Sequence, residues 1–88
     1  MKTPPLGTEV RIRWLDSTSL SGWQYLPPGK ELNEHPRPIT SLGVLVGVNS
    51  TSIVIAGTVG TEEAGDKTRG YLDPLIIPRG CIIEMRRL

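Results

Sequence analysis

The chain has 88 residues, which is enough for one small domain, residues 1–88, and too few for a multidomain enzyme. Hydrophobic residues make up 38% of it, and eight prolines with ten glycines exclude a coiled coil and long helices. Ten Lys and Arg residues against nine Asp and Glu residues give a net charge of +1, which lacks the basic excess of proteins that bind duplex nucleic acid.

The chain has one cysteine, Cys81, which excludes an internal disulfide. Together with the one histidine, His35, it supplies too few ligands for structural zinc. The first residues contain no apolar stretch typical of a signal peptide, and no apolar run reaches the length of a membrane span. We therefore expect a cytoplasmic protein that has no metal, no cofactor and no membrane partner.

Residues 1–7 contain two prolines and a glycine and are expected to form a loose lead-in to the domain. Residues 9–14 then alternate strictly between apolar and charged side chains, which predicts a half-buried strand. The apolar face consists of Val10, Ile12 and Trp14, and the charged face of Glu9, Arg11 and Arg13. We expect the apolar face, including Trp14, to pack in the core.

Turn-forming residues from Asp16 to Gly22 predict the start of a long first loop. A short apolar run at 23–26 interrupts this loop, and four prolines keep residues 27–38 irregular. The alternating residues 40–49 predict a second strand, which ends in a tight turn at Asn49-Ser50.

Three further strands are predicted at residues 51–57, 75–77 and 81–86. The second and third strands of the chain would form a hairpin, and Pro78-Arg79-Gly80 would form a short 3₁₀ connection to the fifth. Residues 58–70 are polar and rich in glycine, which predicts a mobile loop. The pattern as a whole favours an all-β fold, a small five-stranded SH3-like or Sm-like barrel, because closure leaves few free strand edges.

The alternation also predicts which side chains lie outside this barrel. In the second strand Leu42, Val44, Val46 and Val48 share one face, and in the fifth strand Cys81, Ile83 and Met85 do so. The apolar residues left on the outer side are Leu45, Val54, Ala56 and Ile82. Clustered exposed apolar groups mark interfaces, and a thin core gains stability from association. We therefore expect a homo-oligomer, either a dimer or a ring.

Several short motifs follow one another along the chain, namely Trp14-Leu15-Asp16-Ser17, Gly22-Trp23, Ser41-Leu42-Gly43 and Ile77-Pro78. In this order they resemble small Sm-like or SH3-like β-barrel proteins encoded by phage and prophage genomes, over about residues 8–88. The resemblance implies a phage origin and a small barrel, and it brings no catalytic residues to this chain. The proline-rich segment 27–38 is longer than that pattern has.

Candidate ligand-binding residues are aromatic and basic. Trp23 and Tyr25 lie in the first loop, where Trp23 either covers one end of the barrel or offers a surface on which a base can stack. Arg11 and Arg13 face outward from the first strand, and pairing of the first and last strands would bring Arg86 and Arg87 to the same side. Guanidinium groups bind phosphate through paired hydrogen bonds, although Glu9 and Glu84 would balance part of this charge.

Catalysis is not expected. Asp16, Ser17 and His35 have the residue types of an acid, a nucleophile and a base, but nothing in their spacing brings them into contact. A solvated histidine and a loop capped by Asp16 and Ser17 explain these residues more simply. The acidic residues Glu62, Glu63, Asp66 and Asp73 do not have the spacing of a calcium loop.

These observations predict a non-enzymatic, oligomeric binding protein. Its Arg side chains would hold phosphates, and Trp23 or Tyr25 would stack a base. Given the phage origin that the resemblance implies, the ligand would be a nucleotide-derived immune signal of the infected bacterium, sequestered by a sponge. The alternative is an Sm-like or SH3-like adaptor that binds RNA or protein.

Overall fold

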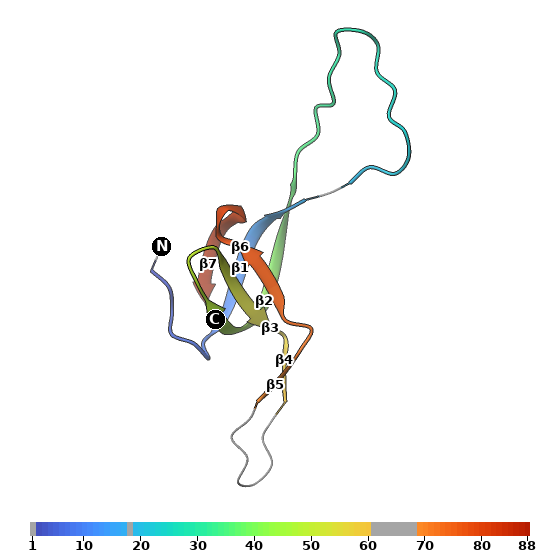
Figure 1. The fold of residues 1–88 in the computed structure, drawn as a ribbon. Coiled ribbons are helices and arrows are strands. Elements are labelled where there is room, and N and C mark those ends of the chain that lie inside the picture. The colour runs from blue at the N-terminus through green and yellow to red at the C-terminus, as the bar shows by residue number, and fades with distance from the viewer. Residues whose placement is uncertain (1, 18, 61–68) are drawn as a thin grey trace.

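The computed structural model describes residues 2–17, 19–60 and 69–88. This part of the chain is all-β, with seven strands and one short 3₁₀ helix, η1 (Figure 1). The strands are β1 (Glu9–Asp16), β2 (Arg37–Val48), β3 (Ser52–Ala56), β4 (Thr58–Gly60), β5 (Gly70–Leu72), β6 (Leu75–Pro78) and β7 (Ile82–Arg87), with η1 at Arg79–Cys81 between the last two. None of the described residues forms a helix with the length and apolar character needed to cross a bilayer.

Five strands form one antiparallel sheet in the order β6-β3-β2-β1-β7. The predicted first and last strands are neighbours in it, and the predicted hairpin and 3₁₀ connection are both present. The prediction of a closed barrel is wrong in this respect: β6 and β7 are the two edges of the sheet and do not pair with each other. η1 joins these edges, and Arg79 at its start donates its backbone N–H to the carbonyl of Thr51 at 2.9 Å.

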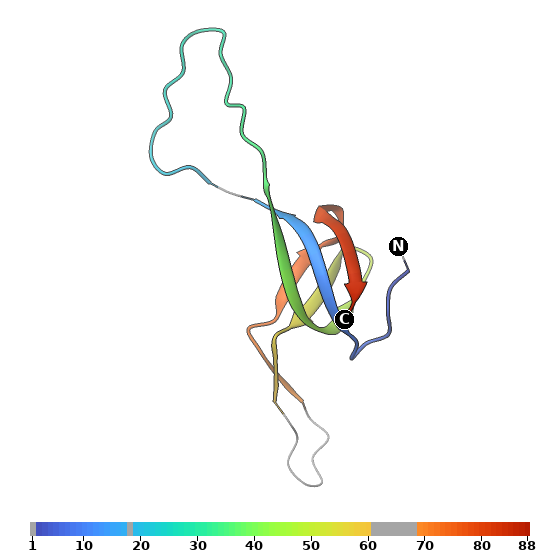
Figure 2. The ribbon, with the colours of Figure 1, turned by 180° about the vertical axis from the view of Figure 1, so that it is seen from behind.

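The core lies on the concave side of this sheet, which bends around it (Figures 1 and 2). Its buried members come from four strands: Val10, Ile12 and Trp14 of β1, Leu45 of β2, Ile53 and Ile55 of β3, and Ile77 of β6. The predicted apolar face of β1 is therefore confirmed. The Trp14 indole Nε1–H donates to Ser41 Oγ at 3.0 Å, so its polar group is satisfied although the ring is buried.

The predicted faces of β2 are wrong. Leu45 is fully buried, whereas Leu42 is 59% exposed. The register explains this, because β1 pairs Val10 with Gly43, and residues directly opposite each other point to the same face. The inner positions of β2 are thus the small residues Ser41 and Gly43, which accommodate the bulky side chains of β1 and β3. Ala56 of β3, expected outside, is also buried.

The predicted face of the last strand is correct for Cys81 and Met85, which pack against the core, and wrong for Ile83. A bulge follows the pairing of Arg13 with Glu84, and Trp14 then pairs with Ile82, which leaves Ile83 without an opposite residue. Ile82 therefore packs against the core, and Ile83 is exposed. Of the four apolar residues expected outside, Val54 keeps an outward position, opposite Gly47 and the exposed Ile76. Ala56 shares this face of β3 with Val54, although it is buried.

Three segments expected to be irregular are ordered by pairing. β2 begins at Arg37 and includes Pro38, which pairs with Leu15 of β1 at a position that β3 does not reach. β4 lies at the start of the predicted loop 58–70 and pairs with β5, which begins at its last residue, to form a two-stranded ribbon. Residues 61–68 of this loop lie outside the described residues. The lead-in is also hydrogen-bonded to the sheet, because Gly7 donates its N–H to the Leu45 carbonyl of β2 at 2.8 Å.

The molecule is elongated, with extents of 66 × 29 × 22 Å. Its radius of gyration is 17.7 Å, against about 12 Å for a compact chain of this length. Figures 1 and 2 show the cause: the segment between β1 and β2 projects from one end of the sheet and the β4–β5 ribbon from the other. We call the first projection, residues 17–36, the arm.

Candidate functional site

The arm carries the predicted aromatic residues. Trp23 and Tyr25 are each 86% exposed, and three leucines of the arm are exposed with them: Leu20, Leu26 and Leu32. Trp23 therefore does not cover an end of the sheet, which was one of the two positions expected for it. The arm presents large apolar side chains that contribute nothing to the core of their own chain.

Only local contacts shape the described part of the arm. Gln24 Nε2 donates to the Ser21 carbonyl at 3.0 Å, and the Lys30 N–H donates to the Pro27 carbonyl at 3.1 Å. Gly22 and Gly29 have φ angles of +73° and +80°, a region that favours glycine and turns the chain. Loops of this length without secondary structure are usually functional loops or linker segments.

The predicted arginine face is largely present on β1 and β7. Arg11 lies opposite Arg86, and Arg13 lies opposite Glu84. Arg87, in contrast, pairs with Val10, whose side chain points into the core, so Arg87 is directed to the side of β7 away from Arg86. We use "arginine face" below for Arg11, Arg13 and Arg86.

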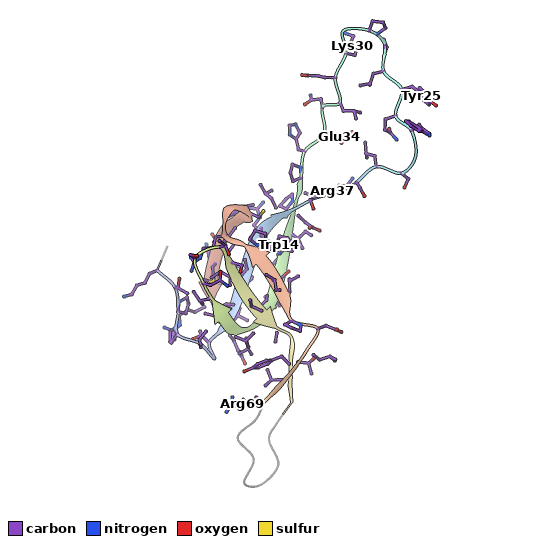
Figure 3. All side chains as sticks on the ribbon, viewed as in Figure 1. Trp14, Tyr25, Lys30, Glu34, Arg37 and Arg69 are labelled. Carbon is purple, nitrogen blue, oxygen red and sulfur yellow. The ribbon has the colours of Figure 1, made fainter. Side chains whose placement is uncertain are left out.

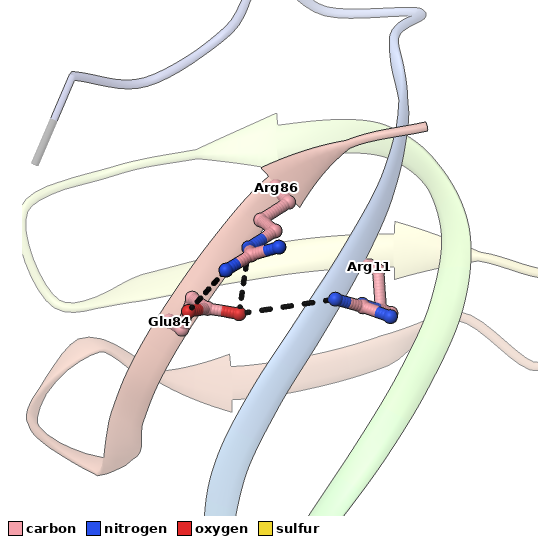
Figure 4. Close-up of polar contacts among 3 residues, drawn as sticks. All are labelled: Arg11, Glu84 and Arg86. Atoms are coloured by element: carbon pink, nitrogen blue, oxygen red, sulfur yellow. Dashed lines mark hydrogen bonds and ion pairs between the residues drawn. The ribbon is translucent and has the colours of Figure 1, made fainter.

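Glu84 balances part of the charge of this face (Figure 4). Its Oε1 lies 3.0 Å from Arg86 Nε and 4.0 Å from Arg11 Nη2, and its Oε2 accepts a hydrogen bond from Arg86 Nη2 at 3.3 Å. All three side chains are substantially exposed to solvent. The carboxylate therefore occupies the Arg86 guanidinium and reduces the positive charge that this face offers to an anion.

Replacement of Glu84 by glutamine is expected to change the free energy of unfolding by less than about 1 kcal/mol, because exposed ion pairs stabilise proteins weakly. Urea denaturation of the variant beside Glu9→Gln, which removes a charge on the same strand pair, measures this. A loss much larger than that of the control would show that Glu84 holds the sheet together rather than arranging the arginine face.

The aromatic and basic groups do not meet within one chain. The arm leaves the sheet where Asp16 at the end of β1 pairs with Arg37. Arg11 lies nearer the opposite end of β1. Figure 3 shows Tyr25 near the outer end of the arm and Arg37 at its base. One protomer therefore has stacking groups and phosphate-binding groups at separate places.

The base of the arm holds the residues considered for catalysis. Ser17 and His35 line a shallow depression of about 230 Å³ together with Glu34 and Pro36. Both side chains are exposed, and no hydrogen bond joins these two described residues. In the segments that the structure describes, no three His, Cys, Asp or Glu side chains lie close enough to share a metal ion.

One cavity among the described residues was not predicted from the sequence. It has a volume of about 450 Å³ and lies between the lead-in, β2 and the β4–β5 ribbon. Its lining is Leu6, Gly7, Val44, Leu45, Val46, Val59, Arg69 and Tyr71. The signal that identifies the ribbon in the sequence is weak, since β4 and β5 are three residues each and only Val59 and Tyr71 mark them as strands.

The chain was compared with protein-family models, with curated proteins and with solved structures, and none of the three comparisons gives a match.

Proposed function

We propose that the protein is a non-enzymatic binding protein that works as a homo-oligomer. The observation that carries this proposal is the arm, whose Trp23 and Tyr25 are each 86% exposed in the single chain. Aromatic side chains dominate the energetics of interfaces because they bury a large area. A second copy of the chain is a partner that is present wherever the protein is, and its surface can bury the side chains of the arm.

The proposed binding site lies between copies. The arm of one protomer brings Trp23 and Tyr25 to a neighbour, whose Arg11 and Arg86 supply the guanidinium groups. Such a site suits a small ligand with a ring that stacks and a phosphate that accepts hydrogen bonds. We propose a nucleotide-derived signal as this ligand, sequestered in the cytoplasm of a phage-infected bacterium, in keeping with the resemblance described above.

The order of the strands supports a relationship to SH3-like or Sm-like folds, although the sheet is open. The four strands β1, β2, β3 and β6 follow one another as a meander, and a single 3₁₀ turn returns the chain so that β7 pairs with β1. The two remaining edges, on β6 and β7, offer unpaired backbone groups that a second copy can use.

Native mass spectrometry tests the assembly. The wild-type chain is expected to form an oligomer, and a double variant, Trp23→Ser with Tyr25→Ser, is expected to be monomeric, because these side chains lie in the interface and outside the core. Leu72→Ser, which removes an exposed apolar side chain from the β4–β5 ribbon, is the control and should leave the oligomer intact.

Calorimetry against cyclic nucleotides and ADP-ribose derivatives then tests the ligand. Binding by the wild type and its loss in the monomeric double variant support the composite site. A wild-type chain that is monomeric at high concentration would contradict the proposed assembly. Binding of a different protein to the arm of such a monomer would favour the adaptor instead.

A further inference from the structure

The cavity beneath the β4–β5 ribbon has the size and lining of a small-molecule site. Its volume of about 450 Å³ falls within the range of ligand pockets in proteins, roughly 300–1,000 Å³. Three segments that are remote in the sequence form it: the lead-in, the middle of β2 and the ribbon. All of them belong to one chain, so this cavity does not depend on assembly.

Backbone hydrogen bonds hold one wall of the cavity in place. The Gly7 N–H donates to the Leu45 carbonyl at 2.8 Å, and the Leu45 N–H donates to the Thr8 carbonyl at 2.8 Å. The Thr8 hydroxyl also donates to the Pro5 carbonyl at 2.7 Å, which closes a turn around Leu6. The lead-in thus runs as an extra paired segment along β2 and fixes Leu6 and Gly7 at the rim.

The ribbon forms the opposite wall. Val59 pairs with Tyr71, and Gly60 pairs with Gly70, which leads directly to Arg69. Figure 3 shows Arg69 at the lower end of the ribbon. Tyr71 is 43% exposed, which leaves part of its side chain open to a ligand.

The side chains that line this cavity are of three kinds: apolar, aromatic and basic. Val44 and Val46 give an apolar floor. Tyr71 contributes a ring against which a planar ligand can stack, and Arg69 contributes a guanidinium that can bind a phosphate. An apolar wall, one aromatic ring and one cation are together complementary to a flat ring that bears a negative group.

We propose that this cavity binds a nucleoside monophosphate moiety, with the base against Tyr71 and the phosphate on Arg69. The inference rests on the proposed function for the class of ligand, and it differs in placing base and phosphate within one protomer. In a larger nucleotide-derived signal, this site would hold one nucleotide unit.

Isothermal titration calorimetry with AMP as the probe tests this inference on the full chain. AMP is expected to bind with one site per chain, and adenosine and inorganic phosphate are each expected to bind more weakly. Tyr71→Leu should weaken AMP binding by roughly 5- to 150-fold, the equivalent of about 1–3 kcal/mol for loss of stacking on a base. Arg69→Gln should weaken AMP binding and leave adenosine binding unchanged.

Leu72→Ala is the matched control, because Leu72 follows Tyr71 directly on β5, is 63% exposed and does not line the cavity. Unchanged AMP affinity in this variant, with loss in Tyr71→Leu, supports the cavity. If AMP affinity falls in Tyr25→Leu and not in Tyr71→Leu, the inference is overturned and the proposed site between copies is supported. Absence of AMP binding by the wild type also overturns it, while native mass spectrometry judges the proposed assembly separately. If circular dichroism shows that Tyr71→Leu is unfolded, Arg69→Gln tests the inference instead. A loss of affinity for AMP with unchanged affinity for adenosine in this variant supports the cavity, and unchanged affinity for both overturns it.

Discussion

Replacement of Ile77 by alanine is expected to lower the free energy of unfolding by about 2–5 kcal/mol. Ile77 is fully buried and pairs with Ile53, another fully buried core residue. Its removal would leave a cavity in a core of seven buried side chains. Small domains have a net stability of only about 5–15 kcal/mol, so this loss is a large fraction of the total.

Ile76 provides a matched control on the same strand. It precedes Ile77 directly, points to the other face of the sheet and is 64% exposed. Ile76→Ala is therefore expected to cost less than about 1 kcal/mol in the dilute, monomeric protein. Urea denaturation followed by circular dichroism measures both variants. Equal losses for the two would mean that the described concave core is wrong.

A second large effect is expected for Gly43→Val. Valine favours strands, so propensity alone predicts a gain in stability at a mid-strand position. The structure predicts the opposite, because a Cβ atom on residue 43 would lie 2.9 Å from the Ala56 carbonyl oxygen and 3.2 Å from Ile55 Cβ. The first contact is with backbone of the paired strand, which cannot turn aside as a side chain can. We expect a loss of about 1–3 kcal/mol or more.

The control for this prediction is Gly57→Val. Gly57 follows β3 directly, its φ angle is not positive, and a Cβ atom at this position would meet no other atom within 4 Å. Thermal unfolding of both variants should show a clear decrease in melting temperature for Gly43→Val and little change for Gly57→Val. A stabilised Gly43→Val would indicate that β2 and β3 are spaced more widely than described.

Local chemistry in the sequence was sufficient for several elements. The alternation in residues 9–14 predicted β1 and its buried face correctly, because a strand repeats every two residues and three apolar side chains in that period define one side. The turn at Asn49 was also predictable. Its Oδ1 accepts hydrogen bonds from the N–H groups of Thr51 and Ser52, both at 2.9 Å, which is a property of asparagine followed by short polar residues.

The candidate site was predicted only in part. The proximity of Arg11 to Arg86 follows from the pairing of the first and last strands. The loop position of Trp23 left open whether it covers an end of the barrel or is exposed. The separation of these groups within one chain does not follow, since it depends on the direction in which the arm leaves the sheet. The Tyr71–Arg69 cavity was missed because it requires the lead-in and the ribbon to lie on either side of β2.

The amino-acid sequence alone thus determined an all-β chain, its main strands, its tight turn and the apolar face of β1. These properties depend on residues within a few positions of one another. Only the tertiary structure decided that Leu45 and Ile82 are inside while Leu42 and Ile83 are outside. A shift of one residue in strand pairing exchanges the two faces, and the pairing partners lie tens of residues apart along the chain.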